Sequence, residues 1–443
     1  MNVDAVLVAL GAAILTNVWR MQDILPQLGV FRPAILSIVA AAFFLLIDRS
    51  PERRERRFST PVTIPLLVYL ALTAALIPAS LDPQLSASFL VKETLATGAL
   101  ALMIAAGVRN GRDLEWLVLV HVLGATFYCL YALLRVPLGP EGHWINIIYY
   151  DNNDFALVAV STIPFALFLL QSGRKLWWRA AGLLATALLF LCVVRTGSRG
   201  GLLGLIALLG YLALRHRTVT ARGRMGVVVA AGLVIALFGR NQIAATVTTL
   251  RNPKADYNWA GNDYNGRIEL WKRGVGYMRD RPLTGVGLAA FPVAEGQLSE
   301  VARERMAHGQ DVKTLVAHNM YIQVGAELGL IALAVFLFVL YRVYHTAVLV
   351  TRAYEPRDDL NRSGLFSAPP ETTLPRLLAA SVVGFCFSAV FIAAAYMAYL
   401  PLLVGFAGAI ARVAPAWVTA PRGRRTYAAP ELADVGVGAG SVA

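Results

Sequence analysis

The sequence has 443 residues, of which 57% are hydrophobic and only 15% are charged. A soluble protein of this length would carry about 25% charged residues, so the composition excludes an ordinary soluble domain. The net charge of +13 would suggest nucleic acid binding in a soluble protein. In a membrane protein a net positive charge can instead come from cytoplasmic loops that are rich in Lys and Arg, so no nucleic acid partner is expected. The three cysteines are scattered in apolar runs, which gives neither a disulfide framework nor a metal-binding spacing.

Apolar runs close to the length that crosses a bilayer recur along the whole chain. We interpret the first run as a retained helix, because no basic residues precede it as they would in a signal peptide. The predicted fold class is an all-α polytopic membrane protein with about twelve transmembrane helices. In chain order these spans are residues 4–19, 28–47, 62–79, 89–107, 114–134, 154–171, 180–194, 200–214, 225–239, 319–341, 377–394 and 397–411.

Basic residues between the spans predict the topology, since cytoplasmic loops attract Lys and Arg. With both termini in the cytoplasm, the six basic clusters all fall on the cytoplasmic side and hold more than half of the 40 basic residues. These clusters are RSPERRERR (49–57), RNGR (109–112), GRKLWWR (173–179), RHRTVTARGR (215–224), the stretch 342–376 and the tail 411–425.

One hydrophilic segment, residues 240–317, is too long to be governed by the charge rule and is predicted to be a large, partly helical periplasmic loop that forms a lid. Within it, NGRIELWKRGVGYMRD (265–280) predicts an amphipathic helix suited to the membrane interface. Its expected apolar stripe is Ile268, Trp271, Val275 and Met278. The predicted domains are transmembrane helices 1–9 (1–239), the loop (240–317), transmembrane helices 10–12 (318–413) and a disordered cytoplasmic tail (414–443).

The outer face then collects the unusual polar motifs: YYDNND (149–154), RTGSRGG (195–201), the long loop and AHNMY (317–321). Arginines at membrane depth are costly and usually have a partner. If Arg195, Arg199 and Arg267 outnumber the local acids, a ligand anion would be that partner, and a guanidinium suits a phosphate because it binds in a bidentate way. Glycines 197, 200 and 201 would let backbone N–H groups approach the same anion.

Structural interpretations compete with each of these arginines. Arg195 and Arg199 could extend their guanidinium groups to the membrane interface without binding anything. Arg267 could lie on an ordinary surface helix.

The other polar residues also have structural interpretations. His318 with Asn319 could cap the following helix, and Asp154 could cap its own helix. Gln323 and Glu327, at helical spacing, could bond each other or a neighbouring helix.

At these residues the sequence resembles the O-antigen ligase and O-antigen polymerase superfamily, over roughly 145–335. The resemblance is carried by four ordered pieces, each weak alone: DNNDFALVAVSTIPF (151–165), RTGSRGGLLGL (195–205), NGRIELWKRGVGYMRDRPLTGVGLAAF (265–291) and AHNMYIQVGAELGLIAL (317–333). The last piece contains a His-Asn-x-Tyr…Glu-x-Gly pattern.

The resemblance implies a membrane-embedded (GT-C-like) glycosyltransferase that needs no metal or other cofactor. Its donor would be a glycan on undecaprenyl diphosphate, at the periplasmic face of the inner membrane, and its acceptor lipid A-core or another glycan. By motif, Arg199 and Arg267, and less directly Arg195, would hold the diphosphate, and His318 would be the catalytic residue that acts on the acceptor hydroxyl. The remaining motif side chains would support the site: Asn153, Asp154, Trp271, Asn319 and Tyr321.

Elementary chemistry agrees with these roles. Fixed arginines can stabilise the charge of a departing diphosphate without a metal ion, and a neutral histidine can accept the proton of a sugar hydroxyl near neutral pH. Direct displacement at the anomeric carbon would invert its configuration. Asp151 and Asp154 could instead bind Mg²⁺, but the arginines already supply the positive charge, so no metal is predicted.

Several functions remain open at this stage. An O-antigen or exopolysaccharide polymerase or a protein O-oligosaccharyltransferase would use the same donor. We prefer the ligase because one outer loop dominates and ends in the His-Asn motif. A transporter of anionic solutes or lipids is the alternative that is not an enzyme. Against it, the sequence has no convincing internal repeat, and its polar residues gather on one face instead of at the bilayer midplane.

Overall fold

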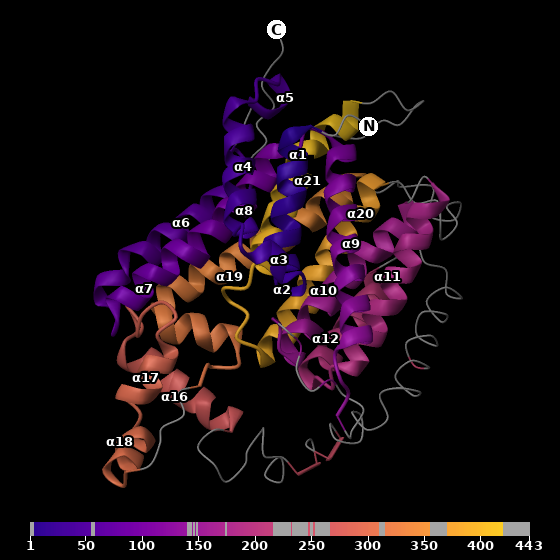
Figure 1. Cartoon of the computed structure of the whole chain (residues 1–443). Helices are drawn as coiled ribbons and strands as arrows, with labels where there is room; N and C mark the ends of the chain where they lie inside the picture. Colours follow the sequence, from indigo (N-terminus) through magenta and orange to yellow (C-terminus); the bar gives the residue numbers. More distant parts are fainter. Residues whose placement is uncertain are drawn as a thin grey trace.

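The computed structural model describes residues 4–54, 58–139, 149–172, 175–215, 266–309, 315–354 and 370–419, with isolated positions at 144, 147, 232, 247–248 and 251–252. Every regular element in these ranges is a helix, which confirms the all-α prediction. The helices form a bundle with the N-terminus and α5 (Pro51–Arg54) at one end (Figure 1). The helices α16, α17 and α18 of the long loop lie at the opposite end (Figure 1).

The bundle is built from long helices with short helical turns between some of them. The long helices are α1 (Ala5–Ala13), α4 (Pro33–Ile47), α6 (Thr63–Ala75), α8 (Leu95–Gly107), α9 (Gly111–Arg135), α10 (Asn152–Ser172), α11 (Leu176–Arg195), α12 (Arg199–Arg215), α19 (Met320–Tyr354), α20 (Pro370–Ser388) and α21 (Tyr399–Thr419). The short elements are η1 (Ile14–Val18), α2 (Met21–Ile24), α3 (Pro26–Gly29), η2 (Ile77–Ala79), α7 (Pro83–Phe89), η3 (Leu90–Thr94) and η5 (Ala389–Phe391).

Six described helices are long and apolar enough to cross a membrane: Pro83–Gly107, Gly111–Arg135, Asn152–Gln171, Leu176–Arg195, Met320–Tyr354 and Glu371–Phe391. Shorter apolar helices are Ala5–Val18, Pro33–Ile47, Thr63–Ala75, Arg199–Leu214 and Tyr399–Ala414. Eleven predicted spans overlap these helices, and the span 225–239 lies outside the described residues. The chain is therefore consistent with a polytopic membrane protein, and the number twelve stays a prediction.

Helix α10 occupies the centre of the bundle and packs against α9, α11, α12 and α20. From Phe155 to Ala166 every side chain of this helix is buried. Two glycines bring α12 close to its neighbours: a Cβ atom at Gly201 would lie 2.4 Å from Cβ of Ala156, and one at Gly204 would lie 1.9 Å from Oγ of Ser388. The glycines of this segment thus serve helix packing, because any side chain would collide with α10 or α20.

Residues predicted to lie on the cytoplasmic side meet at the N-terminal end of the bundle. Arg53, whose side chain is fully buried, pairs with Asp4 at 2.7 Å and with Asp48, and its Nε donates to the carbonyl of Gly107 at 2.7 Å. Burial alone would raise the pKa of Asp4, but the hydrogen bond and charge of Arg53 hold that pKa below its ordinary value. The network ties the starts or ends of α1, α4 and α8 together.

We expect the replacement of Arg53 by alanine to lower the free energy of unfolding by about 1–3 kcal/mol, because it removes the donor that Arg53 supplies to the carbonyl of Gly107 and one charged partner of the half-buried Asp4 and Asp48. Arg54 is the matched control, since the neighbouring arginine is exposed and its replacement should change stability by less than about 0.5 kcal/mol. Thermal unfolding of the purified protein in detergent measures both variants. Equal melting temperatures for the two variants would contradict the prediction.

The long loop is partly helical, with α16 (Arg267–Asp280), α17 (Phe291–Gln297) and α18 (Glu300–Ala307) in its described part. The predicted apolar stripe of α16 is wrong in one respect. The face that packs carries Leu270, Gly274 and Tyr277, whereas Val275 is 53% exposed. The loop builds a small core of its own with Phe291 and with residues of α19, because its helices fold against the protein.

Helix α19 is interrupted at Gly329, whose φ and ψ are 79° and 174°. The interruption separates an outer piece, residues 320–328, from a long piece, residues 330–354. Only glycine tolerates this backbone conformation at little cost, and a Cβ atom there would lie 2.7 Å from the carbonyl carbon of Leu283. The outer piece carries His318 and Asn319 at its start, so the interruption sets the direction of the segment that carries the predicted catalytic residue.

Candidate functional site

The DNND motif forms the beginning of the central helix α10. Oδ1 of Asp151 accepts a hydrogen bond from the backbone N–H of Asp154 at 2.7 Å, so the helix cap is Asp151. The capping interpretation of Asp154 is wrong, because Asp154 already lies in the first turn. Asn153 has a direct role in joining motifs: its Oδ1 accepts a hydrogen bond from Oγ of Ser198 at 2.8 Å.

The RTGSRGG motif is the turn between α11 and α12. Arg195 ends α11, Gly197 turns the chain with φ +67°, and Arg199 begins α12. Ser198 caps α12, since its Oγ accepts from the N–H of Gly201 at 3.1 Å while donating to Asn153. The turn is therefore fixed to α10 through one hydroxyl group.

Two aromatic residues that sequence reasoning missed hold these motifs together. Trp144 is buried; its N–H donates to the carbonyl of Arg195 at 3.1 Å, and its own carbonyl accepts from Nδ2 of Asn152 at 2.7 Å. Phe391, in η5, lies between α12 and α16: a Cβ atom at Gly200 would be 2.8 Å from its Cβ, and its ring centroid is 6.2 Å from that of Trp271. A helix-breaking signal at 388–398 would have been needed to predict the position of Phe391, and the apolar sequence there contains none.

The AHNMY motif begins α19. Oδ1 of Asn319 accepts from the N–H groups of Tyr321 at 2.9 Å and of Ile322 at 3.0 Å, so Asn319 is the helix cap. The capping interpretation is thus confirmed for Asn319 and wrong for His318, because His318 precedes the cap and holds a left-handed backbone with φ +46°. Such a conformation is uncommon in residues other than glycine and often marks a functional site.

His318 lies in the electrostatic field of two other motifs. Burial lowers the pKa of its imidazole below the ordinary value of 6.5, and the positive charge of Arg267 lowers this pKa further, against a smaller opposite effect of Asp151. The imidazole is therefore neutral at neutral pH. The charges of Arg267, at the start of α16, and of Asp151, at the start of α10, thus both act on His318.

The four motifs share one geometric property: each of them begins a helix, namely α10, α12, α16 and α19. Asn153 and Ser198 join the first two helices, Phe391 lies between α12 and α16, and the field of Arg267 reaches His318 before α19. Asp151, Ser198 and Asn319 already accept from N–H groups at three of these helix starts, so the shared property is the partial positive charge of a helix N-terminus. The arrangement is therefore suited to a negatively charged ligand, with a neutral histidine beside it.

The comparison with known families agrees with this arrangement. A family model described as O-antigen ligase matches residues 184–337. Residues 184–337 are therefore similar to the O-antigen ligase family. The resemblance that the motifs suggested is thereby confirmed for a segment from within α11 to within α19. No curated protein matches the chain.

The matched segment includes Arg195, Arg199, Arg267, His318 and Asn319, whereas the DNND motif lies before it. Tyr321 follows the cap, and its hydroxyl donates to the carbonyl of Cys386 at 2.9 Å. This bond fixes the start of α19 to the end of α20.

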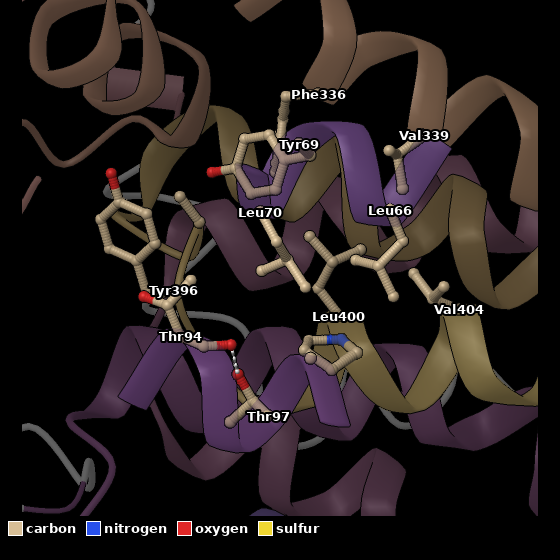
Figure 2. Close-up of a pocket in the computed structure, with 13 residues that line it drawn as sticks. Leu66, Tyr69, Leu70, Thr94, Thr97, Phe336, Val339, Tyr396, Leu400 and Val404 are labelled. Carbon is tan, nitrogen blue, oxygen red and sulfur yellow. Dashed lines mark hydrogen bonds between the residues drawn. The ribbon is translucent and has the colours of Figure 1, made fainter. Parts of the chain in front are cut away.

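A separate pocket of about 40 Å³ lies within the bundle (Figure 2). Leu66, Tyr69, Phe336, Tyr396 and Leu400 are among its lining residues, and Figure 2 shows their side chains around it. None of the predicted site residues lines this pocket, so it is distinct from the meeting point of the four motifs. Tyr396 borders it and also reaches the buried carboxylate of Glu327.

Among the residues that the structure describes, no group of three His, Cys, Asp or Glu side chains is arranged to hold a metal ion. Asp151 and Asp154 are joined by the capping bond of Asp151. The independence from metal ions stays a prediction that activity measurements must test.

Proposed function

We propose that the protein is an O-antigen ligase of the membrane glycosyltransferase type. It transfers a glycan from undecaprenyl diphosphate to a sugar hydroxyl of lipid A-core, at the periplasmic face of the inner membrane. The observation that carries the proposal is His318 itself, which holds a left-handed backbone just before α19 and whose pKa is lowered by burial and by the charge of Arg267. The O-antigen ligase domain at 184–337 supports the same class of reaction.

The proposed step is a single displacement. The acceptor hydroxyl attacks the anomeric carbon of the donor sugar while the bond from this carbon to the diphosphate oxygen breaks. The lipid diphosphate leaves with the electron pair, and Arg199 and Arg267, with Arg195, stabilise its negative charge. His318 takes the proton of the acceptor hydroxyl. Attack opposite the leaving group inverts the anomeric configuration.

The supporting residues orient the catalytic ones. Asn319 caps α19 and thereby fixes the backbone beside His318. Asn153 fixes the turn that precedes Arg199 through Ser198. Trp271 packs against Phe391 one turn after Arg267, which holds the start of α16.

The purified protein is expected to release undecaprenyl diphosphate from a lipid-linked glycan when lipid A-core is present, and to do so in EDTA. A lipid-linked glycan as the sole acceptor separates the ligase from a polymerase, because only a polymerase would then lengthen the glycan. Release that requires both Mg²⁺ and Asp154 would overturn the metal-free mechanism. Protein that is folded yet transfers to neither acceptor would overturn the proposed function.

A further inference from the structure

The break in α19 is filled by the segment that follows α16, residues 281–291, here called the Pro-Gly turn. In an uninterrupted helix the N–H of Leu330 would bond the carbonyl of Ala326. Instead Leu330 donates to the carbonyl of Pro282 at 2.7 Å, and the carbonyl of Ala326 accepts from the N–H of Val286 at 2.8 Å. The Pro-Gly turn thus replaces hydrogen bonds that the helix lacks.

The side chain of Glu327 makes a second set of bonds to the same turn. Its two carboxylate oxygens accept from the backbone N–H of Ala289 at 3.0 Å and of Phe291 at 3.2 Å. The hydroxyl of Tyr396 donates to Oε2 at 2.6 Å. Glu327 is 1% exposed. A carboxylate at this depth is expensive unless it is fully bonded, and here two amides and a phenol are its bonding partners.

Each segment that Glu327 joins leads to a residue of the proposed site. Phe291 packs its ring 5.6 Å from that of Tyr277, which fixes α16, the helix that begins with Arg267. Tyr396 follows η5, which carries Phe391 between α12 and α16. Glu327 itself belongs to the outer piece of α19, which His318 precedes.

We infer that Glu327 is a positioning residue for glycan transfer: it clamps the Pro-Gly turn and the segment of Tyr396 to the outer piece of α19, and so holds Arg267 and His318 at their working separation. The effect of Glu327 on glycan transfer rests on the proposed function. The clamp, meaning the attachment of the Pro-Gly turn and of the Tyr396 segment to α19, does not depend on that function.

Hydrogen–deuterium exchange of the full-length protein in detergent tests the clamp. Glu327→Gln keeps the shape of the side chain but turns one acceptor into an N–H₂ donor, so exchange of the amides in 282–291 should quicken about tenfold. Tyr396→Phe removes one donor and should have a smaller effect. Glu300→Gln is the control, since Glu300 lies in α18 of the same loop with its side chain 89% exposed. Unchanged exchange in Glu327→Gln would overturn the clamp.

The positioning role is tested with the same variants. In Glu327→Gln the rate of transfer per folded protein at saturating donor should fall at least about tenfold, as expected when catalytic groups lose their alignment, while donor affinity changes less than threefold. A purely structural residue would lower the yield of folded protein and leave this rate intact, which would overturn the role. If the wild-type protein transfers no glycan, the proposed function fails, and the exchange result still decides whether the clamp exists.

Discussion

Replacing His318 with alanine is expected to lower the single-turnover rate of glycan transfer by about 10²–10⁴-fold, the usual range for loss of a general base. Donor affinity should stay nearly unchanged, because the arginines that bind the diphosphate remain. Stability should also stay nearly unchanged, since Asn319 caps α19 and the alanine variant retains it. The rate and the affinity for the lipid donor are measured at equal amounts of folded protein.

Two further variants separate a catalytic role of His318 from a structural one. His318→Asn suits the left-handed backbone at this position, because asparagine adopts it readily, but it supplies no comparable base. An active His318→Asn variant would remove the catalytic role from His318. Asn319→Ala should instead lower stability by about 1 kcal/mol through loss of the cap. The transfer rate of the wild type should fall at acidic pH, as the imidazole with its lowered pKa becomes protonated.

Replacing Arg199 or Arg267 with alanine is expected to weaken donor binding as well as turnover. The loss per arginine should be about 2–5 kcal/mol, the usual cost of truncating one partner of a buried charged pair. Lysine at either position should restore only part of the affinity, because it keeps the charge but loses the bidentate geometry. Equilibrium binding of undecaprenyl diphosphate to each purified variant measures the effect.

Arg279 is the matched control for Arg267, because it lies on the same helix with a side chain that is 83% exposed. Arg279→Ala should leave donor affinity within the error of the measurement. If Arg267→Ala binds the donor as tightly as Arg279→Ala does, Arg267 is an ordinary surface residue and the diphosphate site must be sought elsewhere. This pair of variants therefore separates a specific contact from the general positive charge of the loop.

Hydropathy and motif spacing together predict the broad arrangement. The helical fold follows from the apolar runs, whereas the outer position of the four motifs, inferred from the charges between those runs, stays a prediction. The hydrogen bond between Asn153 and Ser198 was not predicted, nor was the effect of Arg267 on the pKa of His318. The sequence alone does not predict which helix starts lie close together in space.

Details of one or a few residues could not be predicted, because they depend on the backbone path. Whether Asp151 or Asp154 caps α10, and whether His318 or Asn319 caps α19, is decided by the residue at which each helix begins. Several candidate caps stand close together in both motifs, so composition cannot choose among them. The buried face of α16 was predicted incorrectly for a related reason. Gly274 has no side chain to mark it as buried, but a Cβ atom there would lie 2.4 Å from Cγ2 of Ile322.

Because the Pro-Gly turn precedes α19 in the chain, it leaves the ribosome before the helix whose carbonyl groups it binds. As the outer piece of α19 arrives, the carbonyls of Ala326 and Glu327 lack the helical donors that an unbroken helix would provide, and such groups are costly in hydrocarbon. If the loop lies outside, as predicted, these carbonyls are bonded only after the Pro-Gly turn has crossed the membrane and folded back onto this piece. With that topology the loop would take part in the insertion of α19, and deletion of residues 281–291 is expected to impair it.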